Sequence, residues 1–363
     1  MATQIAGHAL ANDVADYIHF RAACAPWRDN TEDPKKYGVL DQRFHPRRWI
    51  LLPTESNAHD DSRSWRRMVN LSQGTKITVD LPHLQGHAVA AGSGGSPGGV
   101  LVLIHEQSLV VRLLNPLTGQ RIDLPSVASA LSRRRNGRLD KEFSGLCNVT
   151  GAGFAGDSTV VLHFGYDKRL VSAKIGGDRW EMVSEGSLLC SAFPFYGKVY
   201  FANGDGLMVV DPEAAPLPKL VLAAKWPQME ITLVQMADSS GELMVLTNKA
   251  RFRKGTDEYM VEFEIFRLDA NGGVLVLVTD LGERAVFVGD YGGGLVVSSV
   301  KGIVPNAIYF QHDRYNKFYV RRVSNDETRL LTEAQKGSFI DDLTSYVASN
   351  GGKSKAQEAL AVV

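Results

Sequence analysis

The sequence predicts an antiparallel all-β domain, and three observations lead to that prediction. From about Arg47 onward, short runs of β-branched and aromatic residues follow one another, separated by Gly, Asn, Asp and Pro. Almost no helical period interrupts them until about Thr332, so the chain lacks the crossover helices that parallel strands require. One hairpin pattern also recurs. The runs include WILL (49–52), KITVDLP (76–82), STVVLHF (158–164) and VEFEIF (261–266).

The recurring hairpin consists of a strand, a polar turn and a second strand. Its copies begin near residues 100, 159, 199, 243 and 307. A four-stranded propeller blade takes about 40 to 50 residues, which fits this spacing. With the runs at 49–52 and 76–82 counted as the first blade, the sequence predicts a β-propeller of about six four-stranded blades, with five or seven left open. A β-sandwich is the alternative, although sandwiches rarely repeat one hairpin at this period.

Helical segments are expected at both ends of the chain. Residues 11–28 predict one helix, capped by Asn12 or Asp13 and ended by Pro26. The residues that recur there at helical spacing are Val14, Tyr17, Phe20 (or Arg21), Cys24 and Trp27. SFIDDLTSYV (338–347) predicts a short amphipathic helix capped by Ser338. The chain thus divides into a helical segment (1–30), a linker (31–46), a propeller (47–331) and a C-terminal helix with a flexible tail (332–363).

Composition and charge narrow the classes of function. The chain has 40 Lys and Arg against 40 Asp and Glu, which argues against nucleic acid as the main partner, because phosphate binding relies on excess basic charge. The three cysteines, Cys24, Cys147 and Cys190, lie far apart and favour a reducing compartment. Neither a signal peptide nor an apolar run of membrane-spanning length is recognisable. We therefore expect a cytoplasmic or nuclear protein that binds no membrane.

Three glycine-rich motifs match catalytic or nucleotide-binding patterns without meeting their chemical requirements. GAGFAG (151–156) fits the dinucleotide pattern, but a strand follows where a helix must begin, so we interpret its glycines as a hairpin turn. GGSPG (94–98) fits the nucleophile elbow, but Pro97 has no N–H to donate to an oxyanion. GGKS (351–354) lacks a strand-to-helix context, and the nine histidines show no zinc spacing. The sequence predicts no enzyme, no cofactor and no metal site.

Three segments carry a resemblance to a known family. DVADYIHFRAACAPWR (13–28) is similar to the second half of a plant F-box, in which Asp16, Phe20, Arg21, Cys24, Trp27 and Arg28 stand in recurring places. NPLTGQRIDLP (115–125) is similar to the first blade of F-box-associated propellers. LGERAVFVGDYGGGLVVSS (281–299), followed by PNAIYFQHD (305–313), resembles the C-terminal signature of the plant domain of unknown function 295, the KIB-type propeller. The resemblance covers roughly residues 11–330.

The resemblance implies a substrate receptor of a Skp-cullin-F-box ubiquitin ligase. The six F-box residues would form the F-box core or bind a Skp-type adaptor, and the propeller would recruit an unidentified target protein for ubiquitination. An F-box usually opens with Leu-Pro and a Leu-rich helix, which MATQIAGHAL (1–10) does not provide, so we expect an N-terminally truncated F-box. The alternative is a stand-alone protein-interaction propeller without adaptor binding, and a propeller enzyme is a third class.

A target-binding site is expected on one rim of the propeller, where loops from several blades converge. Four aromatic residues near predicted turns serve there either as anchors or as core residues: Tyr166, Trp180, Tyr196 and Tyr291.

Overall fold

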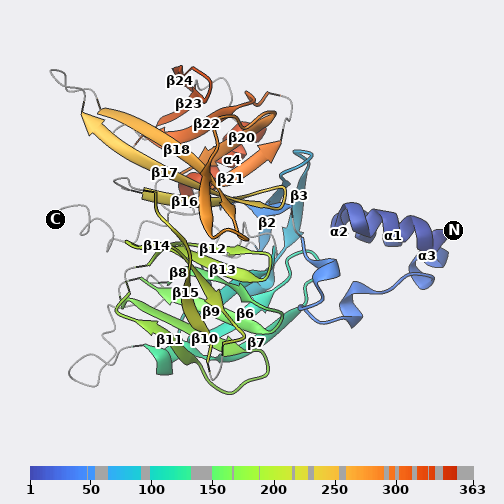
Figure 1. Ribbon diagram of the computed structural model, residues 1–363. Coiled ribbons are helices and arrows are strands. Elements are labelled where there is room, and N and C mark those ends of the chain that lie inside the picture. The colour runs from blue at the N-terminus through green and yellow to red at the C-terminus, as the bar shows by residue number, and fades with distance from the viewer. Residues whose placement is uncertain are drawn as a thin grey trace.

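The computed structural model shows a ring of β-sheets with helices near both ends of the chain (Figure 1). The residues that the structure describes are 1–46, 48–53, 64–90, 99–131, 149–165, 167–187, 189–214, 217–227, 233–252, 259–289, 294–298, 302–312, 317–325, 327–331 and 338–349.

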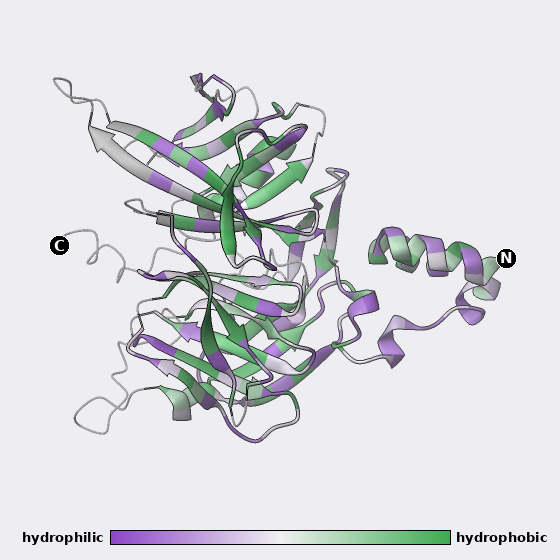
Figure 2. Cartoon of the chain, in the orientation of Figure 1, coloured by the Kyte–Doolittle hydropathy of each residue, from purple (hydrophilic) through white to green (hydrophobic). Residues whose placement is uncertain are grey.

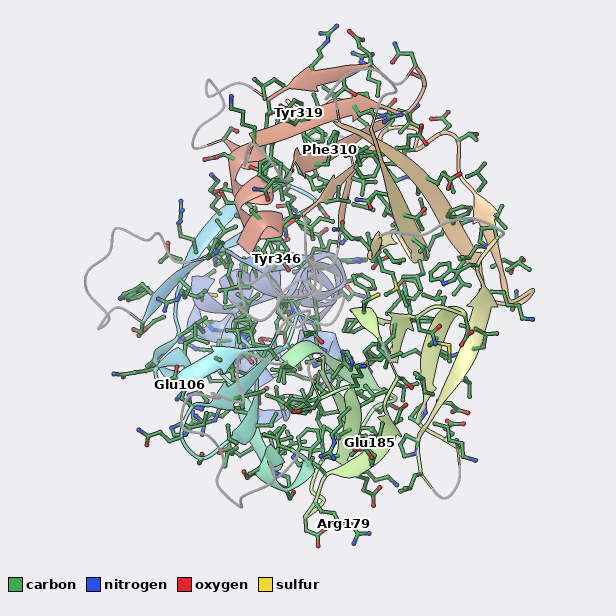
Figure 3. All side chains as sticks on the ribbon, turned by 90° about the vertical axis from the view of Figure 1, so that its left-hand side faces the viewer. Glu106, Arg179, Glu185, Phe310, Tyr319 and Tyr346 are labelled. Atoms are coloured by element: carbon green, nitrogen blue, oxygen red, sulfur yellow. The ribbon has the colours of Figure 1, made fainter. Side chains whose placement is uncertain are left out.

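Six sheets form the six blades of a propeller and surround a common centre (Figure 3). Blade 1 holds β1 (Trp49–Leu51), β2 (Trp65–Asn70) and β3 (Lys76–Asp80). Blade 2 holds β4 (His87–Val89), β5 (Leu101–His105), β6 (Val110–Leu114) and β7 (Arg121–Ser126). Blade 3 holds β8 (Val149–Ala155), β9 (Thr159–Phe164), β10 (Arg169–Lys174) and β11 (Glu181–Glu185). Blade 4 holds β12 (Cys190–Phe195), β13 (Lys198–Ala202), β14 (Gly206–Asp211) and β15 (Lys219–Lys225); blade 5 holds β16 (Leu233–Ser239), β17 (Glu242–Phe252), β18 (Tyr259–Asp269) and β19 (Val274–Leu277). Blade 6 holds β20 (Arg284–Val288), β21 (Leu295–Ser298), β22 (Ala307–His312), β23 (Lys317–Arg322) and β24 (Thr328–Leu330).

The prediction of a propeller with six blades is confirmed. Each hairpin expected from the sequence is a hydrogen-bonded strand pair within a blade: β5–β6, β9–β10, β13–β14, β17–β18 and β22–β23. An apolar cluster fills every seam between neighbouring blades; for example, Val161 of blade 3 packs with Phe201 of blade 4. The ring forms because a single sheet cannot bury both of its apolar faces without neighbours.

One strand pair departs from the antiparallel prediction. In blade 6, β20 and β22 run parallel, with Ala285 opposite Ala307. The cause is the order of the strands, since β21 pairs with the inner edge of β20 before the chain returns on its other side as β22. Both parallel strands are largely buried and apolar, as parallel strands usually are. The antiparallel prediction is wrong for this pair and right for the other pairs in the described sheets.

The C-terminal helix α4 (Phe339–Ser349) lies at the seam between blades 6 and 1. Blade 1 contains three strands, and Leu343 and Tyr346 of α4 pack in one apolar cluster with Ile50 of blade 1 and Phe287 of blade 6. Figure 3 shows α4 on the inner side of the ring, with Tyr346 near the centre. The helix therefore fills the place beside blade 1 where the other blades have an inner strand.

Polar contacts fix the start of α4. The backbone N–H of Asp341 donates a hydrogen bond to Ser338 Oγ at 3.3 Å, which confirms the predicted cap. Lys76 on β3 forms an ion pair with Asp342, with 2.5 Å between Nζ and Oδ2. The end of the helix also approaches blade 6 closely, because a Cβ built on Gly289 lies only 2.1 Å from the carbonyl oxygen of Val347. Only glycine fits at that position.

The GAGFAG glycines lie mainly in a strand, so their interpretation as a hairpin turn is wrong except for Gly156. Gly151 and Gly153 belong to β8, next to β12 of the following blade. A Cβ on Gly151 would lie 1.9 Å from Cβ of Ala192, and one on Gly153 would lie 2.6 Å from Cγ of Pro194. Close approach of two inner strands requires these glycines. The strand β9 that follows agrees with the rejection of a dinucleotide site.

The N-terminal segment holds three α-helices where the sequence predicts one. They are α1 (Ala2–Asn12), α2 (Val14–Ala23) and α3 (Ala25–Asp29). Elsewhere in the described residues, the short 3₁₀ helices are η1 (Pro34–Lys36), η2 (Gln42–Phe44), η3 (Pro82–Leu84) and η4 (Val127–Ala130). The backbone is extended at Asp13 (φ −159°) and at Cys24 (φ −158°), which ends α1 and α2. We call α1–α3 the helical lobe; Figure 1 shows it on one side of the ring. Hydrophilic and hydrophobic residues alternate along it (Figure 2).

Candidate functional site

The carboxylate of Asp13 joins the helical lobe to the ring. It caps α2 by accepting a hydrogen bond from Ala15 N at 2.7 Å. Its two oxygens also accept from Trp49 Nε1 at 3.0 and 2.9 Å, and Oδ2 accepts from Asn70 Nδ2 at 3.0 Å. Asp13 is only 9% exposed, so these donors replace the water that a buried carboxylate loses. The lobe is thereby held in one orientation on blade 1.

The turn between β6 and β7 supports the lobe from blade 2. Asn115 is buried, and its Oδ1 accepts hydrogen bonds from the backbone N–H groups of Leu117 and Thr118. Its Nδ2 donates to the carbonyl of Phe44 at 2.8 Å. Leu117 packs against the apolar side of the lobe, beside Tyr17. The NPLTG segment therefore anchors the N-terminal part of the chain.

Arg21, one of the six F-box residues predicted from the sequence, lies buried inside the lobe. Its Nη1 donates to the carbonyl of Arg28 at 3.0 Å, and to the carbonyl and hydroxyl oxygens of Thr31 at 2.5 and 2.7 Å. Its Nη2 lies 4.0 Å from the carboxylate of Asp33. Arg21 ties the end of α2 to α3 and to the start of the linker, so its contacts are those of a core residue.

Half-buried Phe20 and exposed Trp27 form an aromatic pair at one end of the lobe. Their rings stack with centroids 4.4 Å apart and an interplanar angle of 6°. The carbonyl of Trp27 accepts from the hydroxyl of Thr31 at 2.7 Å, which fixes the last turn of the lobe. Trp27 nevertheless remains 40% exposed. We call this stacked pair the aromatic ledge.

The other three predicted residues lie around this pair. Asp16 is half-buried in the first turn of α2 and accepts from Asn12 Nδ2 at 2.5 Å. Cys24 is half-buried at the junction of α2 and α3, and the Arg28 side chain is exposed. The structure thus brings Phe20, Arg21, Trp27 and Arg28 together at one end of the lobe and leaves Asp16 at the start of α2. Their role in adaptor binding stays a prediction.

A cavity of about 360 Å³ lies where the lobe meets the ring. It is lined by Gly7, Leu10, Ala11, Asn12, Asp13, Val14, Arg43, His45 and Arg48. Arg43 is neutralised there, since it pairs with Asp41 at 2.7 Å and with Glu32 at 2.8 Å. The hydrogen bond from Arg43 lowers the pKa of the Asp41 carboxyl below its usual value. The cavity is a gap between lobe and ring that both polar and apolar side chains line.

The aromatic residues expected near turns separate into two kinds. Trp180 is buried in the seam between blades 2 and 3 and donates from Nε1 to the carbonyl of Pro125 at 2.9 Å, so it is a core residue. Tyr196 is exposed at the β12–β13 turn, with a positive φ of 46°. Tyr166 and Tyr291 lie outside the described residues. The motifs GGSPG and GGKS, and also Cys147, lie outside them as well.

The described part of the chain has neither a cluster of metal-ligating side chains nor a helix that could span a membrane. No group of three or more His, Cys, Asp or Glu side chains gathers there in a way that could hold a metal ion. None of the helices described is both long enough and apolar enough to cross a membrane.

Sequence reasoning missed two parts of the site, α1 and the contact between Asp13 and blade 1. The Asp13 contact joins residues 36 and 57 positions apart, and no local pattern encodes it. One signal was present, because Asp13 interrupts an Ala-rich run and is one of the two predicted caps.

Several solved structures resemble the chain in fold. One is TolB from Acinetobacter baumannii, with a TM-score of 0.39 and 9% identity over 80% of this chain and 65% of that chain. Another is a structural genomics protein of unknown function from Bacteroides thetaiotaomicron, with a TM-score of 0.37 and 11% identity over 78% of this chain and 66% of that chain. The Cps50 (Swd1) β-propeller domain from Myceliophteria thermophila also matches, with a TM-score of 0.35 and 11% identity over 78% of this chain and 89% of that chain. The chain spans just under two thirds of the length of the first two. Likeness at this level supports no assignment of function.

A comparison with curated proteins gave no match. The family comparison is informative, because the model of the KIB1-4 β-propeller matches residues 63–334. The matched region contains most of blade 1 and all of blades 2 to 6. A β-propeller fold of this kind suggests a function in protein interaction. The chain belongs to the KIB1-4 β-propeller family.

Proposed function

We propose that this chain is a protein-binding propeller that serves as substrate receptor of a Skp-cullin-F-box ubiquitin ligase. The helical lobe binds a Skp-type adaptor, and the ring binds the target protein. This role belongs to the cytoplasm or the nucleus. The observation that carries the proposal is the aromatic ledge, in which Trp27 stays 40% exposed on a lobe that Asp13 anchors to the ring.

The lobe has the physical properties of a preorganised binding surface. Val14, Ala15 and Tyr17 on one side of α2 are buried against α1 and the ring. Trp27 lies on α3 and is held by its stack on the half-buried Phe20 of α2. Rigid aromatic side chains give much contact area at a low entropic cost, and tryptophan is enriched among residues that dominate binding energy. Such a ledge supports docking of another protein.

The positions of the F-box-like residues also support the proposal. Arg21 fixes α3 through its bonds to Arg28 and Thr31, and α3 carries Trp27. A charged side chain used in this way sets the geometry of the surface without itself being the surface. We therefore assign contact with the adaptor to Phe20, Trp27 and Arg28 and assign a positioning role to Arg21.

Calorimetric titration of the whole chain with a Skp-type adaptor tests this function. Binding in the range of about 1 to 10 µM is expected for the unaltered chain. Trp27→Ala should weaken it about tenfold or more, because it removes an aromatic anchor. Trp65→Ala is the matched control, since Trp65 is 57% exposed on β2 of the ring. Absence of any binding heat at about 50 µM would rule out the adaptor role.

A stand-alone protein-interaction propeller is the second candidate. The Asp13 contact favours this candidate, because it fixes the lobe to blade 1. A lobe fixed in this way can cover part of the ring as a structural element, without binding an adaptor. Affinity purification from cells followed by mass spectrometry separates the two candidates. An adaptor that accompanies the unaltered chain and is lost with Trp27→Ala supports the ligase role. Recovery of the same target proteins with both chains, and of no adaptor with either, supports the stand-alone role.

A further inference from the structure

The outer edge strands of the blades differ in what they expose. An edge strand has unpaired backbone N–H and C=O groups, and soluble proteins protect such edges with charged side chains or proline. The outer strands β3, β7 and β11 follow this rule, except that Met182 on β11 is exposed. The other exposed side chains on these strands are polar: Lys76, Thr78, Asp80, Arg121, Asp123 and Glu185.

β15 of blade 4 and β19 of blade 5 do not follow this rule. Of the thirteen large apolar side chains exposed in the described part of the chain, five lie on these two strands. We call these five residues the apolar strip: Val221, Leu222, Val274, Val276 and Leu277, between 40% and 55% exposed. Single exposed apolar residues are normal on protein surfaces, whereas a contiguous group of them marks an interaction surface.

The strip is one continuous surface, because the two strands lie side by side on neighbouring blades. Ala223 of β15 and Leu275 of β19 pack against the same apolar cluster. A Cβ on Gly273, just before β19, would lie 3.3 Å from the carbonyl of Ala223. The exposed residues on either side of this contact therefore present a single apolar rim.

Opposite charges flank the two halves of the strip. β15 begins at Lys219 and ends at Lys225, both exposed. At one end of β19, Asp269 pairs in register with Val274, and at the other end exposed Asp280 follows. Lys219 and Lys225 lie six residues apart at the two ends of β15, about 20 Å along an extended strand. β15 and β19 therefore both have apolar centres, and the charges that flank them are opposite.

We propose that the apolar strip is a homodimer interface, in which β15 of one copy faces β19 of the second. A two-fold axis places β15 against β19 of the partner and β19 against β15 of the partner at once. Both lysines of each copy then meet carboxylates at the ends of the facing strand. Such a contact is closed, so it yields dimers and no filaments.

The geometry of the ring leaves the helical lobe free in this dimer. The lobe contacts blades 1 and 2, whereas the strip lies on blades 4 and 5. Dimerisation therefore does not depend on adaptor binding. A dimer would present two target-binding rings and two lobes in one assembly, which raises the effective concentration of one site near the other.

Sedimentation velocity of the whole chain measures the proposed association. Between about 1 and 100 µM the sedimentation coefficient should rise from that of a monomer to that of a dimer. Leu277→Arg places a charge in the strip and should weaken association at least tenfold. Lys219→Glu combined with Lys225→Glu should weaken it as well, because carboxylates then face Asp269 and Asp280.

The matched control is Leu330→Arg on β24, which changes an exposed leucine on another edge strand. This variant should dimerise as the unaltered chain does, and all variants should keep the same melting temperature because the changed side chains are exposed. A chain that stays monomeric at about 100 µM overturns the proposal and leaves the strip to a different protein. Dimers that persist in Leu277→Arg, or that dissociate equally in Leu330→Arg, overturn it too.

Discussion

Helices meet the propeller ring in two places, and the physical basis of the contact differs between them. α4 contributes Leu343 and Tyr346 to an apolar seam between blades 6 and 1. α2 meets the ring through Asp13, whose carboxylate accepts from Trp49 and Asn70. Apolar burial is non-directional and scales with area, whereas hydrogen bonds to a buried carboxylate set an orientation. The difference indicates that α4 stabilises the ring and that Asp13 orients the lobe.

The largest effect is expected from a change that opens the ring seam. Leu343→Ala removes a fully buried side chain from the cluster that joins blades 6 and 1. It should lower the free energy of unfolding by about 3 kcal/mol, because it loses apolar burial and leaves a cavity. Chemical denaturation followed by tryptophan fluorescence measures this loss. Ala348→Gly, at an exposed position next to the end of the same helix, is the control and should cost less than about 1 kcal/mol.

A smaller effect, confined to the lobe, is expected from the Asp13 contact. Asp13→Ala leaves Trp49 Nε1 and Asn70 Nδ2 without their acceptor and removes the cap of α2. The docking of the lobe should weaken by about 2 kcal/mol. Hydrogen exchange should then quicken in residues 2–29 and stay unchanged in α4.

Asp29→Ala is the matched control for that measurement, because Asp29 is exposed at the end of α3. It should leave the exchange rates of the lobe close to those of the unaltered chain. Equal quickening of exchange in the lobe and in α4 after Asp13→Ala would show that lobe and ring unfold together, and the distinction between the two contacts would fail.

The smallest expected effect depends on pH and belongs to the ring alone. His163 is buried between blades 3 and 4, with Nδ1 2.7 Å from the hydroxyl oxygen of Thr150, and burial lowers its pKa to about 4. The unfolded chain, with a histidine pKa near 6.5, then binds more protons, so stability falls as the pH drops from 6.5 towards 4. At pH 5.5 this loss is about 1 kcal/mol.

Substitution of His163 isolates that contribution from those of the carboxylates. His163→Gln does not titrate and keeps a polar group for Thr150. The difference in unfolding free energy between pH 7 and pH 5.5 should be about 1 kcal/mol smaller in this variant than in the unaltered chain. Equal pH dependence of the two chains would contradict the assignment. Lobe exchange rates should show no such difference, because His163 lies in the ring.

Repeated local patterns made the ring predictable from the sequence. Each hairpin carries its own strand period and turn residues, and their spacing gives the number of blades. The cap of α4 at Ser338 was predictable for the same reason, since it is a contact between near neighbours. The parallel pair β20–β22 was not predictable, because the hydrophobic pattern of a strand does not tell which neighbour it pairs with.

The candidate site was predictable only in part. Helical spacing pointed to Phe20 and Trp27 as neighbours, although the two stacked rings belong to different helices, α2 and α3, which the extended backbone at Cys24 separates. The break at Cys24 was hidden, because the apolar spacing continues across it to Trp27. Asp13 was one of the two predicted caps, but its contact with residues 36 and 57 positions away was hidden, since no local pattern encodes it. The buried role of Arg21 was hidden as well, since the acceptors are backbone carbonyls that the sequence does not encode.

Hydrogen exchange of the whole chain with and without a Skp-type adaptor tests the central claim most directly. The account predicts slower exchange in residues 14–29, around the aromatic ledge, and unchanged exchange in α4 and in blades 4 and 5. Trp27→Ala should abolish this protection. Protection confined to the ring, or absent at saturating adaptor, would contradict the claim that the helical lobe is the adaptor-binding surface.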